Sequence, residues 1–225
     1  MKRIFFLLAL AILALFSVAC ASNTNNTNNT APATPAKAQP TATKSSLNGK
    51  KILVAYFSAT NNTKKVAEEL AKSTGADIYR IEAAQSYSAN PYDDKDRIQK
   101  EAYENLRPEV KLLLPKSEMA KYDVIFVGSP IWWHQPAMVV CTFLESYDLS
   151  SKTVVPFFTY GARSYLNESM QRIYKSTPNS IHVPTNLPKD IDPDNIKQPQ
   201  TDDDGIIMPA DTANIDEWLK ALKLK

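Results

Sequence analysis

Residues 51–63 read K-I-L-V-A-Y-F-S-A-T-N-N-T and run directly into K-K-V-A-E-E-L-A-K. Residues 52–57 form an unbroken apolar run, which is typical of a strand buried on both faces of a parallel sheet. From residue 64 onward the apolar positions recur with helical spacing, and charged side chains occupy the other face. The stretch therefore predicts a strand, a short turn and a helix.

The turn between this strand and this helix carries many hydroxyl and amide side chains. Ser58, Thr60 and Thr63 supply hydroxyl donors, and a helix that starts at once after a strand leaves unpaired N–H groups and the positive end of its dipole there. Such a turn can hold a phosphate without a cationic side chain. It is neither a Walker P-loop nor a dinucleotide fingerprint, because GK[ST] and the glycine spacing are missing. A hydroxyl-rich helix cap without a ligand is the alternative interpretation.

The composition is that of one globular domain with appendages. The chain has 225 residues, of which 44% are hydrophobic, enough for one well-buried core. The formal net charge of +2 comes from Lys2 and Arg3, and the rest of the chain has as many acidic as basic side chains. A balanced charge gives no reason to expect nucleic acid as a partner.

Residues 1–20 have the features of an export signal, namely a basic start, an apolar stretch and a small-residue exit. The apolar stretch is too short to span a membrane permanently. Cys20 resembles the lipid-modified cysteine of bacterial lipoproteins, so we expect a protein that faces outside the cytoplasm and meets the membrane through a lipid anchor only. Cleavage after Ala21 would instead release a soluble protein.

Residues 21–48 consist mainly of Asn, Thr, Ala, Pro and Ser. A segment with so little to bury is predicted to be a disordered tether. We therefore expect the folded domain to comprise residues 49–225.

Within this domain apolar strand patterns alternate with helical patterns. This alternation predicts an α/β fold with a parallel sheet. Pro156 conflicts with the fourth strand, because proline removes a donor from the ladder. Trp218 is expected in the core, since it lies on the apolar face of the last helix. The predicted strands are residues 52–57, 76–81, 122–128, 153–159 and 179–184, and the later helices are residues 94–105, 137–147, 165–176 and 212–224.

Little in the sequence indicates a metal site or a reactive cysteine. Cys141 lies in a helical pattern and is interpreted as a small core residue; the other cysteine is Cys20, so no disulfide is expected. The aspartates at 190, 192 and 194 alternate as in a calcium loop, but Asn195 and Thr201 stand where that loop needs Gly and Glu. Residues 202–205 are interpreted as an exposed turn, and no metal site is predicted.

Two further turns carry aromatic residues. In open α/β sheets ligands bind beyond the carboxyl ends of the strands, so the turns after the first, third and fourth strands are expected to converge. The third strand is followed by P-I-W-W at residues 130–133, and the fourth by T-Y-G at residues 159–161. Adjacent tryptophans suit stacking against a planar heterocycle. A surface aromatic patch for a protein partner is the alternative.

Four motifs together resemble the flavodoxin-like family that is often attached to bacterial lipoproteins. They are S-x-T-x-N-T after the first strand, G-S-P-I-W-W after the third, T-F-L-E-S-Y-D-L-S and K-T-V-V-P-F, in this order. The resemblance covers roughly residues 50–184 and is expected to include the C-terminal helix. It implies a flavodoxin-like three-layer sandwich, with a five-stranded parallel sheet of order 2-1-3-4-5 and helices on both faces, and it implies FMN as the cofactor.

The resemblance also implies which residues bind FMN, and it assigns no catalytic acid or base. Tyr92 is a further candidate. The family usually has Gly where Asn61 and His134 stand here; Asn tolerates a left-handed backbone. His134 is either a loop residue facing solvent or a proton donor or acceptor at the flavin, and Arg163 either lies near the flavin or is solvated. The residues expected to hold the phosphate are Ser58, Ala59, Thr60, Asn61, Asn62 and Thr63, and those expected to flank the ring are Pro130, Ile131, Trp132, Trp133, Thr159, Tyr160 and Gly161.

These expectations combine into an exported FMN-binding protein that takes part in electron transfer. Its partner would be a redox protein or a small-molecule electron acceptor. One alternative is an FMN-dependent NAD(P)H:quinone-type reductase. Another is a binding module of the same fold that has lost the flavin.

Overall fold

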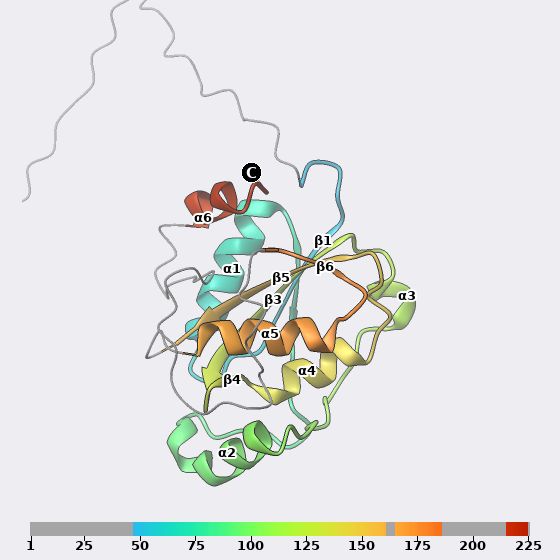
Figure 1. Cartoon of the computed structure of the whole chain (residues 1–225). Coiled ribbons are helices and arrows are strands. Elements are labelled where there is room, and N and C mark those ends of the chain that lie inside the picture. Colours follow the sequence, from blue (N-terminus) through green and yellow to red (C-terminus); the bar gives the residue numbers. More distant parts are fainter. Residues whose placement is uncertain (1–46, 161–164, 186–214, 225) are drawn as a thin grey trace, which may run out of the picture. The chain divides into compact units, whose positions relative to one another are not determined.

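Parallel strands form the central sheet of the computed structural model, which describes residues 47–160, 165–185 and 215–224 (Figure 1). The sheet has the order β2-β1-β3-β5-β6, and the short β4 pairs antiparallel with the end of β3. With β4 left out of the count, this is the predicted order 2-1-3-4-5. The strands are β1 Ile52–Tyr56, β2 Asp77–Arg80, β3 Val124–Trp132, β4 Gln135–Pro136, β5 Thr153–Thr159 and β6 Ile181–His182.

Helices follow the strands as predicted, with differences at the ends. The helix expected over residues 94–105 is preceded by a 3-10 turn, η1, and the short α3 was not predicted. The helices are α1 Asn62–Thr74, η1 Pro91–Asp94, α2 Lys95–Tyr103, α3 Lys116–Met119, α4 Met138–Glu145, α5 Leu166–Ser176 and α6 Ile215–Ala221. Of the predicted last helix, residues 212–214 lie outside the described residues.

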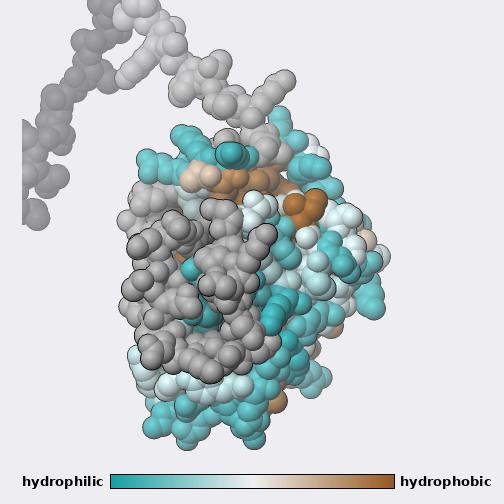
Figure 2. Space-filling model, in the orientation of Figure 1, coloured by the Kyte–Doolittle hydropathy of each residue, from teal (hydrophilic) through white to brown (hydrophobic). Residues whose placement is uncertain are grey.

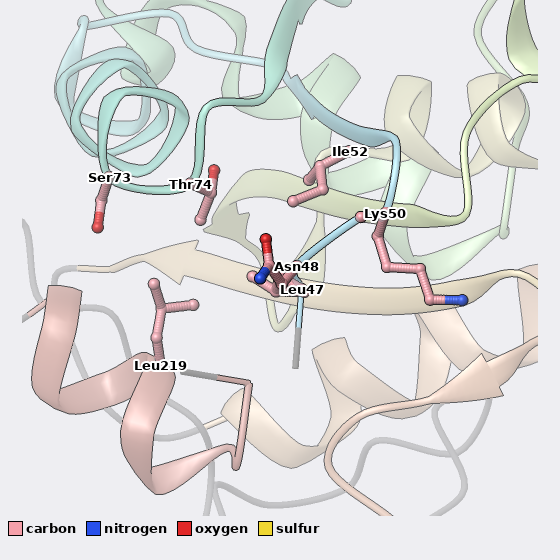
Figure 3. Close-up of a pocket in the computed structure, with 8 residues that line it drawn as sticks. Leu47, Asn48, Lys50, Ile52, Ser73, Thr74 and Leu219 are labelled. Carbon is pink, nitrogen blue, oxygen red and sulfur yellow. The ribbon is translucent and has the colours of Figure 1, made fainter. Parts of the chain in front are cut away.

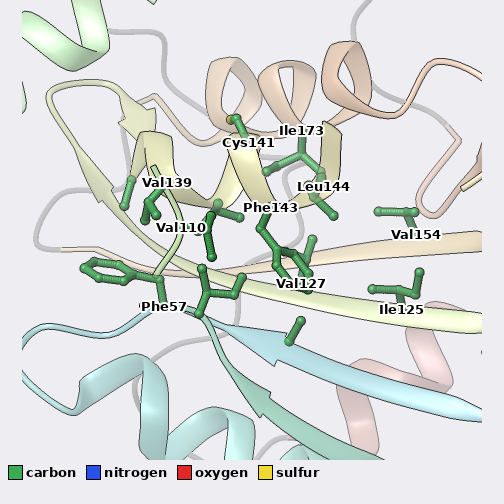
Figure 4. Close-up of a cluster of buried hydrophobic side chains, with 14 of the residues drawn as sticks. Phe57, Val110, Ile125, Val127, Val139, Cys141, Phe143, Leu144, Val154 and Ile173 are labelled. Atoms are coloured by element: carbon green, nitrogen blue, oxygen red, sulfur yellow. The ribbon is translucent and has the colours of Figure 1, made fainter. Parts of the chain in front are cut away.

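The two faces of the sheet bury alternate residues of the same strands. On one face Leu53 of β1 and Ile125 of β3 pack with α4 and α5, as Figure 4 shows for this cluster. On the other face Val54 and Phe126 pack with α1 and α6. Because both faces are covered, the strands read as unbroken apolar runs. The described residues thus form the three layers that were predicted.

Pro156 is accommodated in β5 because β6 is short. The N–H of Thr153 donates to Asp123 on the β3 side at 2.9 Å, and Val154 accepts from Val183 on the β6 side at 3.1 Å. The backbone N–H and C=O groups of successive residues in a strand point alternately to the two neighbouring strands. The backbone nitrogen of Pro156 therefore faces the β6 side. Since β6 ends at His182, opposite Val154, the missing N–H removes no bond of the described ladder.

Two residues interpreted as core are buried. Trp218 packs 6.0 Å from the ring of Phe126. The Cys141 thiol is fully buried, which raises its pKa to about 11. A thiol held in this protonated state is a poor nucleophile, so Cys141 has a packing role.

Among the coloured residues of Figure 2 hydrophilic ones predominate, and apolar residues gather near α6. None of the helices in the described part of the chain has the length and apolar character needed to cross a membrane.

Candidate functional site

The turn after β1 leaves the first N–H groups of α1 open. Asn61 has the left-handed backbone that its position requires, with φ 65°, and α1 begins at Asn62. No side chain caps the helix, and its first turn contains no acidic residue. The N–H groups and the positive end of the dipole are therefore available to an anion.

Ser58 carries an orphaned hydroxyl in this turn. Its side chain is 2% exposed, and its Oγ has no hydrogen-bond partner. A buried hydroxyl without a partner is costly to the fold. Ser58 belongs to the turn whose amides favour an anion.

The second turn is the tip of a β-hairpin, which corrects the prediction of a loop from residue 129. Strand β3 continues to Trp132, which pairs with Gln135 of β4. Only Trp133 and His134 form the turn, and both have positive φ, 46° and 69°. Positive φ at both central residues is the pattern of a type I′ turn, which favours Asn-Gly. Two large rings in these conformations are strained, and such strain is typical of functional sites.

The two tryptophans have different surroundings. Trp132 packs edge-on against Phe57 and Tyr87, with ring centroids 5.3 Å from each. Trp133 is 39% exposed, and the nearest described aromatic contact is with Tyr103 at 6.4 Å. Trp132 is thus fixed by the core, whereas Trp133 presents its ring at the surface.

Buried polar contacts hold the hairpin to α5. The guanidinium of Arg172 donates from Nε to Oε1 of Gln135 at 2.9 Å, and both side chains are buried. A buried bond to a charged donor is strong and directional. It fixes β4, and with it the position of the turn.

The third turn follows β5 and meets the first. The hydroxyls of Thr63 and Thr159 are 2.8 Å apart and buried. Tyr160 comes next, whereas Gly161 and Arg163 lie outside the described residues. The hydroxyl contact joins the start of α1 to the carboxyl end of β5, so the turns converge as predicted.

A pocket of about 420 Å³ lies where the three turns meet. Its described lining is mostly apolar and aromatic, with a few polar groups, which is typical of a cofactor site. The lining residues are Thr60, Asn62, Pro91, Tyr92, Lys95, Ile98, Pro130, Ile131, Trp132, Trp133, Thr159 and Tyr160.

Four of the predicted phosphate-binding residues do not line this pocket. Asn61 shapes the turn and Thr63 contacts Thr159. Ser58 and Ala59 border a smaller neighbouring pocket of about 180 Å³, on the β2 side of the turn. Tyr92, the additional candidate, does line the main pocket.

Tyr92 is the only residue of the wall formed by η1 and α2 that was predicted at the pocket; Pro91, Lys95 and Ile98 were not. The chain leaves the sheet after β2 and returns through an isolated bridge between Ala83 and Val110. The bridge folds the intervening residues, including Pro91, Lys95 and Ile98, back over the carboxyl ends of the strands. The N-P-Y sequence at residues 90–92 was the available signal, because Asn90 accepts from the N–H of Tyr92 at 3.3 Å and Pro91 starts η1.

A partly buried ion pair fixes this wall. Arg97 donates to Glu101 at 2.7 Å and to the backbone carbonyls of Gln85 and Ser86 at 2.9 and 3.2 Å. The hydroxyl of Tyr87 donates to the same carboxylate at 2.6 Å. Because Tyr87 also contacts Trp132, α2 and the hairpin are held in one arrangement.

His134 stacks against Tyr165. The two rings lie 3.4 Å apart at an interplanar angle of 20°, and Nδ1 is buried without a hydrogen-bond partner. His134 is partly buried and is not among the described residues that line the main pocket. Its ring joins the hairpin tip to the start of α5.

Protonation of His134 is expected to weaken the fold. Burial lowers the pKa of His134 from 6.5, so the folded chain binds fewer protons here than the unfolded chain. The stabilising contribution is complete above about pH 6.5 and is lost as the pH falls through the lower pKa of the folded state. The free energy of unfolding should thus fall from about pH 7 to about pH 5 more steeply in the wild type than in His134→Asn, measured by urea denaturation.

Asn suits this comparison because it tolerates positive φ. The pKa of His182 is also lowered by burial. His182 is present in both proteins, so its contribution to the pH dependence of unfolding cancels in the comparison. Parallel pH profiles for the two proteins would contradict the prediction.

The described residues contain no group of His, Cys, Asp and Glu side chains that could hold a metal ion. The aspartates at 190–194 and the turn at 202–205 lie outside the described residues, as do Cys20 and most of the predicted tether.

Another pocket, of about 220 Å³, lies at the opposite end of β1. Figure 3 shows Leu219 of α6 and Thr74 of α1 lining it together with Ile52. Ligands of open α/β sheets bind at the carboxyl ends of the strands, and this pocket lies near their amino ends. The main pocket is therefore the candidate site.

The chain is similar to a known family and to several solved structures. A family model described as Flavodoxin matches residues 51–198. Two crystal structures, each named a "putative flavoprotein", come from Bacteroides eggerthii DSM 20697, with 32% identity and a TM-score of 0.58, and from Bacteroides uniformis ATCC 8492, with 27% and 0.57. The matches cover 79% of this chain and 100% of the first protein, and 77% and 99% for the second.

A flavoprotein of Lactobacillus acidophilus NCFM, solved in complex with FMN, has the same fold. Its TM-score is 0.52 at 20% identity, and the match covers 76% of this chain and 99% of that protein. No curated protein matches the sequence.

Proposed function

Because the chain belongs to the flavodoxin family, and thus is in general terms a flavin-binding redox protein, we propose that it binds FMN in the main pocket and transfers electrons outside the cytoplasm. The family match and the FMN-bound neighbour support this cofactor. One observation carries the proposal: the turn before α1, whose N–H groups are open to a phosphate, and the two aromatic turns meet at one pocket.

The phosphate would be held at the start of α1. The open N–H groups of Asn62 and Thr63 and the hydroxyls of Ser58 and Thr60 are the donors available there. Thr63 cannot move freely, because its hydroxyl contacts Thr159. The turn is preorganised by the fold, and preorganisation reduces the entropic cost of binding.

The flavin ring would lie against the hairpin and the third turn. Trp132, Trp133 and Tyr160 supply aromatic surface, and Ile131 and Pro130 supply apolar surface. Bound FMN accepts and gives one or two electrons, while the protein sets its orientation and its potential. The pocket walls exclude water from one side of the ring.

Replacing Ser58 with alanine should have opposite effects on the two forms of the protein. Without flavin the change removes an unsatisfied buried hydroxyl, so the free energy of unfolding should stay the same or rise by about 1 kcal/mol. With FMN the change removes a phosphate donor, so Kd should rise about tenfold. Urea denaturation of the apoprotein and fluorescence titration with FMN measure the two effects.

Riboflavin, which lacks the phosphate, is the control ligand. Its Kd should be the same for Ser58→Ala and the wild type. An equal loss of affinity for both flavins would mean that Ser58 acts on the ring or on the fold. The proposal that the phosphate binds at this turn would then be wrong.

A carrier and an enzyme are distinguished by their electron donors. A reductase of the NAD(P)H:quinone type would turn over with a nicotinamide donor and a quinone, whereas a carrier would need a protein reductase. A flavin-free binding module is disfavoured, because Asn61 adopts the left-handed backbone expected of the family's glycine. A purified protein without the yellow absorbance of flavin, even after FMN is added, would overturn the proposal.

The proposed location rests on the sequence of the N-terminal segment. The basic start, the apolar stretch and Cys20 favour export and lipid attachment, and the tether would let the domain stand away from the membrane. Cells fed a radiolabelled fatty acid should label the wild-type protein and not Cys20→Ser. Release of unlabelled wild-type protein would support cleavage after Ala21 instead.

A further inference from the structure

Lys95 is the one charged side chain among the described residues that line the main pocket. It stands at the start of α2, and no carboxylate of the described residues forms an ion pair with it. Two neighbouring carboxylates are engaged elsewhere: Asp94 accepts from the N–H of Ser88, and Asp93 from the hydroxyl of Ser88 at 3.2 Å and from Asn90 at 3.0 Å. Lys95 is therefore a cation available to a ligand.

The surroundings of Lys95 are apolar and aromatic. Pro91 and Ile98 lie on the same wall of the pocket, and Tyr92 is 83% exposed at its rim. Trp133, also exposed, belongs to the facing hairpin. Aromatic faces together with a cation suit a flat, conjugated molecule with a negative substituent.

The phosphate of FMN has its own donors on a different element. The start of α1 offers open N–H groups and the Ser58 hydroxyl, so the phosphate needs no lysine. The wall formed by η1 and α2 is then free for a second molecule beside the flavin.

We propose that η1 and α2 form a subsite for a planar aromatic anion, of the chemical class of a hydroxynaphthoquinone or an aromatic sulfonate. Lys95 pairs with the negative substituent, and Tyr92 contacts the rings. The inference rests on the proposed function, because it assigns the rest of the pocket to FMN.

Binding to the FMN-loaded protein tests the subsite with a matched pair of ligands. Naphthalene-2-sulfonate carries the charge, and naphthalene-2-sulfonamide has a similar shape without it. By isothermal titration calorimetry the wild type should bind the sulfonate about fivefold more tightly than the sulfonamide, as expected for a partly exposed ion pair. Lys95→Gln should abolish this preference.

Lys100→Gln is the matched control, because Lys100 is an exposed lysine of the same helix that does not line the pocket. It should retain the preference for the sulfonate. The subsite is wrong if the two variants behave alike, or if the wild type binds neither naphthalene. It is also wrong if Lys95→Gln weakens FMN and spares riboflavin, since Lys95 would then serve the phosphate. Failure of the wild type to bind FMN would instead overturn the proposed function.

Discussion

Trp133→Ala is expected to raise the Kd for FMN about thirtyfold while it changes the free energy of unfolding by less than about 1 kcal/mol. Stacking of a flat ring on an aromatic side chain contributes roughly 1–3 kcal/mol, and the ring of Trp133 is exposed at the pocket. Fluorescence titration and urea denaturation measure the two quantities.

Trp132→Ala should lower both affinity and stability. Its ring packs 5.3 Å from Phe57 and from Tyr87, so truncation leaves a cavity and should lower the free energy of unfolding by about 3 kcal/mol. Trp133→Phe, which keeps an aromatic face, should restore most of the affinity for FMN. If Trp133→Ala binds FMN as tightly as the wild type, the hairpin tip does not contact the flavin.

Gly128→Ala is expected to lower the free energy of unfolding by about 3 kcal/mol, at the upper end of overpacking costs. Gly128 lies beside Phe157 in the sheet register. A Cβ at Gly128 would lie 2.3 Å from Cζ and 2.6 Å from Cε2 of Phe157. The phenyl ring is fully buried, so it has no free space in which to move.

Phe157→Leu tests this reason. The double variant should be destabilised by less than the sum of the single variants, because the smaller side chain makes room for the new methyl group. Additive losses in urea denaturation would show that the contact with Phe157 is not the cause.

The fold was predictable because its strands are buried on both faces. Continuous apolar runs and the helical period from residue 64 indicated the order of elements, and comparison with solved flavoproteins confirms the fold. Short elements escaped prediction: Gln135 and Pro136 of β4 carry no strand pattern, and they pair because the turn at Trp133 and His134 closes the hairpin.

The candidate site was predictable where it follows the ends of strands. Topology alone brings the three turns together, so Thr60, Trp132 and Tyr160 could be expected at one pocket. The wall that contains Lys95 depends on the bridge between Ala83 and Val110, a pairing of residues far apart in the sequence. No local pattern encodes such a contact, and the stack of His134 on Tyr165 is hidden for the same reason.

Pro156 has a consequence for association between molecules. Where β6 ends, β5 continues for several residues without a strand partner on that side among the described residues, and an unpaired edge can recruit a strand from another chain. Such a strand needs regularly spaced donors, and residue 156 has none. Because β6 is short, Pro156 removes no hydrogen bond from the described sheet. The same missing N–H deprives a strand from another molecule of a donor, so Pro156 disfavours an intermolecular sheet at this edge.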